Sequence, residues 1–114
     1  IFHSIKMRNI IKIGSIRTAR KFIHVNDVCN GIIKSIKLKG YNLINIQGKK
    51  LISLGEIIKK SQNILKKKIK VIEFDKKNPS IRDIPSDISN KKIKFNPKFN
   101  LTKGLLTIKK NYEK

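Results

Sequence analysis

The sequence has few of the residues on which several kinds of site depend. It contains one cysteine, no tryptophan and only seven acidic residues in a length of 114. The single cysteine, Cys29, excludes an internal disulfide and a cysteine metal cluster within this sequence. We interpret it as a small core residue rather than a nucleophile, because it falls on the apolar stripe of an expected helix. His3 and His24 are far apart, and neither a zinc pattern nor a phosphate-binding loop occurs, so no metal site is predicted.

Long apolar runs and a signal peptide are missing as well. No run approaches the roughly 18–20 residues that a membrane span requires. The default expectation is a cytoplasmic protein without a membrane partner. The chain begins with Ile1, in the middle of an apolar pattern, and this suggests a fragment.

The seven acidic residues stand against 28 basic ones, and the formal net charge is +21. Such a charge ordinarily suggests a nucleic acid or an anionic surface as partner. Here, however, 24 lysines accompany four arginines, 23 isoleucines and 11 asparagines. We attribute the charge to a general drift of the composition toward lysine, isoleucine and asparagine. The lysines are scattered, and they lack the interleaved aromatic residues that would stack on bases. We do not expect nucleic acid as the partner, although a small basic nucleic-acid-binding module stays open as an alternative.

The apolar pattern predicts one domain in which strands and helices alternate, of the α/β class. Strands are expected at residues 10–14, 22–25, 41–48 and 69–74. Helices are expected from Asn26 to about Gly40, after Ser53, at 88–95 with Asp87 as its cap, and from Leu101. Ser53 and Glu56 have the spacing of a capping box, whereas residues 75–86 hold two of the three prolines and are expected to cross the surface as a loop. His24 falls in the second expected strand, where we assign it a structural role.

Five short motifs follow one another along the chain. They are Gly14 six residues before Arg20, "RKFIHVNDV" from Arg20, "NIQG" followed by "ISL", Arg82 five residues before "DIS", and "FNPKFNLTKGL". In this order and spacing they resemble the C-terminal part of the extended short-chain dehydrogenase/reductases, the NAD-dependent nucleotide-sugar epimerases and dehydratases. The likeness covers nearly the whole chain. It implies that residues 1–114 are the C-terminal portion of a Rossmann-like enzyme, with the last Rossmann-side helix and strand and the small substrate-binding lobe.

Some positions depart from the family's pattern. Ile16 and Gln47 stand where the family often has glycine, and Lys21 replaces an acidic residue. The family's glycine-rich dinucleotide turn is missing, and neither Tyr41 nor Tyr112 is followed four residues later by a lysine. The resemblance therefore implies a fragment with no catalytic residue of its own and a natural C-terminal end. The N-terminal half, which binds NAD and carries the Tyr-x-x-x-Lys pair, is expected upstream.

In this family, arginines from two separated segments bind the diphosphate of the nucleotide-sugar. A guanidinium is always charged, and its planar fork of donors matches phosphate oxygens better than an ammonium does. By its motif position, each of Arg20 and Arg82 takes this role. Lys77 is a further candidate, because some members have another arginine there.

Both arginines also have structural explanations. Arg20 could be an exposed edge residue or pair with Asp27, and Arg82 could pair with Asp83 or Asp87. The activity implied for the intact enzyme is that of a UDP-glucose 4-epimerase-like homodimer, which works by transient hydride transfer to NAD. A nucleotide-sugar 4,6-dehydratase of the same family is the alternative, and a non-catalytic relic that folds alone stays open.

Overall fold

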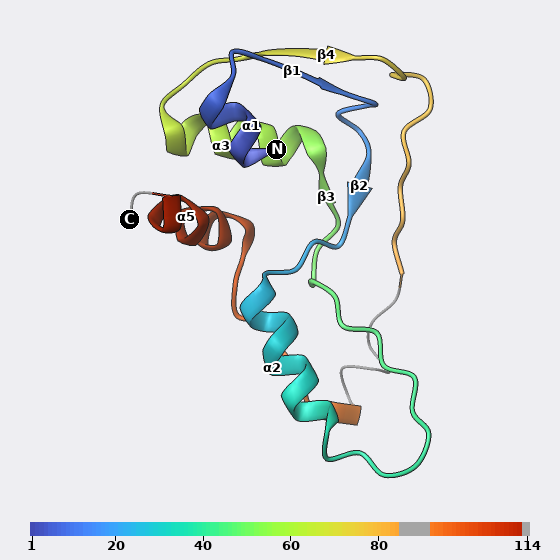
Figure 1. The fold of residues 1–114 in the computed structure, drawn as a ribbon. Helices are drawn as coiled ribbons and strands as arrows, with labels where there is room; N and C mark the ends of the chain where they lie inside the picture. Colours follow the sequence, from blue (N-terminus) through green and yellow to red (C-terminus); the bar gives the residue numbers. More distant parts are fainter. Residues whose placement is uncertain (85–91, 113–114) are drawn as a thin grey trace.

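The computed structural model describes residues 1–84 and 92–112 (Figure 1). Its elements are α1 (Phe2–Met7), β1 (Ile10–Ile13), β2 (Ala19–Arg20), α2 (Val25–Ser35), β3 (Ile52–Ser53), α3 (Leu54–Leu65), β4 (Lys70–Glu73) and α5 (Leu101–Tyr112). The α/β class is confirmed. The radius of gyration is 16.3 Å, whereas a compact domain of this length has a value of roughly 13 Å. The chain is therefore more extended than a self-contained domain. No helix of the described residues is long and apolar enough to span a membrane.

The buried core lies around the parallel pair β1 and β4, which α1 and α3 cover (Figure 1). Ile5, Ile11 and Ile58 are its fully buried members, one each from α1, β1 and α3. Both strands form where the β-branched runs predict them. Ser53 caps α3, because its Oγ accepts from the Glu56 backbone N–H at 3.1 Å. The Glu56 carboxylate pairs with Lys60 at 3.6 Å, so only half of the predicted capping box is observed.

A second, smaller sheet lies beside this core. β2 pairs antiparallel with β3, and on its other side Ala19 forms a parallel bridge with Ile81. β2 is thus the middle strand of three short extended segments. The prediction of a strand at 22–25 is wrong, because the pairing residues are Ala19 and Arg20 and the chain from 21 to 24 leads into α2.

α2 begins one residue earlier than the predicted cap. His24 is its N-cap, with Nδ1 accepting from the Asn26 backbone N–H at 3.0 Å, so this histidine is not in a strand. The helix ends at Ser35, before Gly40, and its apolar face is largely exposed. Cys29 lies exposed, so its assignment to the core is wrong. Figure 1 shows α2 extending away from the β1–β4 pair, so that core does not cover the helix.

The predicted strand at 41–48 does not form. A strand needs a neighbour that accepts and donates its backbone hydrogen bonds, and this segment pairs with no strand among the described residues. Tyr41 and Leu43 are 94% and 82% exposed. Asp87 and the first residues of the expected helix 88–95 lie outside the described residues. The described part of the loop after β4, residues 75–84, and the last helix form as predicted.

Candidate functional site

Arg20 is held against the segment that contains Arg82. One guanidinium nitrogen, Nη1, donates to the carbonyl oxygens of Ala19 at 2.8 Å and Ser80 at 2.6 Å, and Nη2 donates to Ser80 Oγ at 2.9 Å. A guanidinium has five N–H groups, so two have no partner among the residues that the structure describes. The suggested pair with Asp27 is not observed, since that buried carboxylate accepts from two backbone N–H groups elsewhere. Arg20 is therefore oriented, and within the described part of the chain two of its donors are unused.

Arg82 lies beside Arg20 through the backbone register. Its N–H donates to the Ala19 carbonyl at 3.2 Å, and Ala19 bridges Ile81 in parallel. Each arginine directly follows one member of this bridged pair. Because side chains alternate between the faces of extended chain, the two arginines occupy the same face, opposite to the bridged pair. Arg82 is exposed.

Lys77 lies on the turn that follows β4, outside the bridged segments that carry the two arginines. The turn is closed by Asn78, whose N–H donates to the Asp75 carbonyl at 3.1 Å and whose Nδ2 donates to the Asp75 carboxylate at 2.8 Å. Lys77 is exposed and forms no ion pair with a described residue. The structure thus places Arg20 and Arg82 on neighbouring segments. The third predicted residue, Lys77, lies on the turn that precedes Arg82 in the sequence.

Two residues that sequence reasoning noted only as departures hold the Arg82 segment. Lys21 Nζ forms an ion pair with Asp83 at 3.0 Å and donates to the Ile84 carbonyl at 2.9 Å. Gln47 Nε2 donates to the same carbonyl. Asp83 is therefore paired with Lys21 rather than with Arg82. No signal in the sequence could have found these contacts, because the partners are far apart along the chain.

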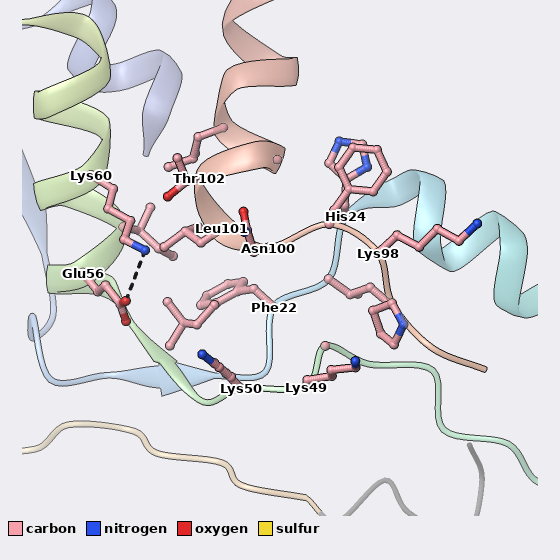
Figure 2. Close-up of a pocket in the computed structure, with 18 of the residues that line it drawn as sticks. Phe22, His24, Lys49, Lys50, Glu56, Lys60, Lys98, Asn100, Leu101 and Thr102 are labelled. Atoms are coloured by element: carbon pink, nitrogen blue, oxygen red, sulfur yellow. Dashed lines mark ion pairs between the residues drawn. The ribbon is translucent and has the colours of Figure 1, made fainter. Parts of the chain in front are cut away.

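A cleft with a cavity volume of about 550 Å³ lies between α3, α5 and the segment 48–52. Its lining is largely apolar and includes Phe22, Ile57, Leu101 and Leu105, with lysines at its margin. Figure 2 shows Phe22 and Leu101 directed into the cleft and the Glu56–Lys60 ion pair on its α3 side. None of the three predicted binding residues lines it. The described residues also contain no group of three or more histidine, cysteine or acidic side chains that could hold a metal ion.

Most of the chain is similar to part of known nucleotide-sugar epimerases. A UDP-glucuronate 4-epimerase from Thermodesulfobacterium geofontis (strain OPF15) is 32% identical over 90 residues, which are 76% of this chain and 28% of that protein. The UDP-glucuronic acid 4-epimerase from Bacillus cereus, solved with UDP-glucuronic acid and NAD, superposes with a TM-score of 0.76 at 20% identity over 92% of this chain and 37% of its own. MoeE5, solved with the same two ligands, gives 0.83 at 15% identity over 98% and 40%. The resemblance to the extended short-chain dehydrogenase/reductase family is confirmed.

The likeness to this family is a likeness to part of its members. The chain spans about a quarter of the curated relative and two fifths of the solved structures. No family model matches it. The solved structures share the Rossmann-like fold of the extended family, and at these identities they establish the fold alone.

Proposed function

We propose that this chain is the substrate-binding part of an NAD-dependent nucleotide-sugar epimerase similar to UDP-glucose 4-epimerase. In this proposal Arg20 and Arg82 bind the diphosphate of the substrate, and Lys77 contributes a weaker attraction from the neighbouring turn. The observation that carries the proposal is the placement of Arg20 and Arg82 at neighbouring backbone positions, on the same face of the small sheet formed by β2, β3 and the bridged residue Ile81. The epimerases among the relatives support this activity over that of a dehydratase.

The charges around the two arginines suit a dianionic ligand. The acidic residue nearest to Arg82 in sequence, Asp83, is paired with Lys21, so it does not neutralise the guanidinium groups. Arg20 is fixed by three hydrogen bonds and therefore loses little side-chain entropy when it binds. Two arginines at neighbouring backbone positions can each donate to phosphate oxygens with good geometry. These features support a diphosphate as the ligand over a single carboxylate.

The contribution of this chain to the reaction is binding and orientation. NAD, when bound to the intact enzyme, supplies the hydride chemistry. No residue of this sequence is assigned to NAD, because it contains neither the glycine-rich turn nor the Tyr-x-x-x-Lys pair, and we propose that another part of the enzyme carries both. Contacts to the diphosphate, far from the reacting sugar carbon, fix the position of the sugar and so raise the rate.

Binding of UDP to the 114-residue chain tests this proposal. We expect Arg20→Lys and Arg82→Lys each to raise the dissociation constant of UDP about tenfold, because lysine cannot form the paired hydrogen bonds of the guanidinium fork. Arg8→Lys, at an exposed residue after α1, is the matched control and should leave the constant unchanged. Isothermal titration calorimetry at ~0.15 M salt measures all three.

The same titration distinguishes the alternative based on net charge. A nucleic-acid-binding module would bind duplex DNA or RNA tightly, and its affinity would fall steeply as salt rises. Tight, salt-dependent binding of nucleic acid together with UDP affinity that is equal in Arg20→Lys and the unchanged chain would contradict the diphosphate site.

A further inference from the structure

One backbone carbonyl next to the arginine site receives two side-chain donors. The Ile84 oxygen accepts from Lys21 Nζ at 2.9 Å and from Gln47 Nε2. A carbonyl oxygen has two lone pairs, so both of its acceptor positions are used. The Lys21 side chain is only 14% exposed and Gln47 is buried. We call the four residues Lys21, Gln47, Asp83 and Ile84 the Ile84 anchor.

The anchor continues the register that places the arginines. Ala19 bridges Ile81 through the backbone, and two residues further along each segment Lys21 forms its ion pair with Asp83. The positions between these two cross-links are those of Arg20 and Arg82. Because side chains alternate between the two faces of extended chain, the Lys21–Asp83 pair lies on the face opposite to that of Arg20 and Arg82. The anchor therefore restrains the arginine segment without occupying the face on which an anion would bind.

Gln47 reaches the anchor because a glycine brings its segment close to residues 21 and 22. The Gly48 N–H donates to the Lys21 carbonyl at 3.3 Å. A Cβ at position 48 would lie 1.9 Å from the Phe22 carbonyl oxygen, so only glycine fits. Three separate segments, 20–22, 47–48 and 82–84, are thereby joined at a single point.

We infer that Lys21 and Gln47 are positioning residues, which hold Arg82 beside Arg20 through Ile84 and Asp83. Without them, the described bonds between this segment and β2 would be those of Ser80 and the backbone bond from Arg82 to Ala19. No described contact would then hold the chain after Arg82, and its guanidinium would search a larger volume before it binds an anion. Restraining a binding segment in advance raises affinity by removing that entropic cost. The inference that this raises affinity for a nucleoside diphosphate rests on the proposed function, whereas the restraint on the segment does not.

Two measurements on the 114-residue chain test the inference, namely the hydrogen-exchange rate of the Arg82 amide by NMR and the dissociation constant of UDP. For Lys21→Met we expect exchange at Arg82 to rise at least tenfold and UDP binding to weaken about tenfold. Gln47→Leu should change both in the same direction by a smaller factor, because it leaves the ion pair intact. Lys21→Arg should restore most of both values, since it keeps a donor and the charge.

The matched control is Lys59→Met, which removes the same charge from an exposed position on α3 and should change neither quantity. A general loss of structure is recognised from the amide of Ile11 in the buried core, whose exchange should be equal in all variants. If Lys21→Met itself fails to fold, the smaller change in Gln47→Leu decides. The effects of Lys21→Met and Gln47→Leu should be less than additive, because both donors share one acceptor.

The outcomes separate the anchor from the proposed function. If the exchange rate of the Arg82 amide is unchanged in Lys21→Met, the inferred restraint on this segment is wrong. The same holds for Gln47→Leu if Lys21→Met does not fold. This conclusion is independent of whether Arg20→Lys weakens UDP binding. Faster exchange at Arg82 with no affinity for UDP in the unsubstituted chain supports the restraint and contradicts the diphosphate site. Faster exchange with unchanged UDP affinity overturns the positioning role of Lys21 and Gln47.

Discussion

Two regions of this protein have similar apolar patterns and opposite burial. In the region around β1 and β4, Ile5, Ile11 and Ile58 are 0%, 7% and 4% exposed. Along α2, Ile33 and Ile36 are 62% and 74% exposed, although α2 is as clearly amphipathic as α3. An apolar stripe on a helix predicts that the face will be buried, but it does not specify what covers it. Large apolar side chains exposed together in this way are typical of an interaction surface.

The unpaired segment 41–48 belongs to the same exposed region. It packs on α2 through Ile46, which lies against Gly31, while Tyr41 and Leu43 project into solvent. The relatives are more than twice as long as this chain. The described residues leave the apolar face formed by α2 and this segment largely exposed.

The largest expected effect is a loss of stability caused by a substitution in the buried core around β1 and β4. Ile58→Ala should lower the free energy of unfolding by about 3 kcal/mol, because it removes buried methyl groups and leaves a cavity. Ile33→Ala, the same substitution on α2, should change it by less than about 0.5 kcal/mol, since the side chain is already in water. Urea unfolding measured by circular dichroism gives both values. Equal losses in the two variants would contradict the difference between the regions.

A second substitution tests the point where the exposed segment is attached. Gly48→Ala should cost about 2 kcal/mol, because its Cβ would overlap the Phe22 carbonyl and force the backbones apart. Gly14→Ala is the matched control, since a Cβ there meets only the Phe74 ring at 3.9 Å. Unfolding curves of the two variants should differ clearly. A Gly48→Ala chain as stable as the control would show that the segment 47–48 is not held against residue 22.

The smallest expected effect concerns the link between α2 and the segment that leads into α5. Asp27, 2% exposed, accepts from the backbone N–H groups of Lys98 and Phe99, each at 2.9 Å. Asp27→Asn keeps the shape but replaces one acceptor oxygen with a donor, so we expect a loss of about 1 kcal/mol. Amide exchange at residues 98 and 99 should rise severalfold, while exchange at Ile11 stays unchanged. Equal changes at all three amides would mean that the substitution acts on the whole fold.

Local signals in the sequence identified the elements that local interactions determine. β1, β4, α3 and α5 were predicted from β-branched runs, from the Ser53 cap and from helical periodicity. The errors lie where a partner decides the structure. Residues 41–48 have the composition of a strand but pair with no strand in the described ranges, and Cys29 lies exposed on a helix whose apolar face these residues leave largely uncovered.

The sequence by itself determined the α/β class, most of the helices, and the family resemblance that singled out Arg20, Lys77 and Arg82. Only the tertiary structure decided that Arg20 and Arg82 are neighbours along the backbone, that Lys77 lies on the turn after β4, and that Lys21 and Gln47 meet at Ile84. The reason is the separation of the contacting residues along the sequence. Caps and periodicity join residues within about four positions, whereas the contacts of Lys21 and Gln47 with Ile84 span 63 and 37 positions, and their register depends on how β2, β3 and the segment after β4 pack together.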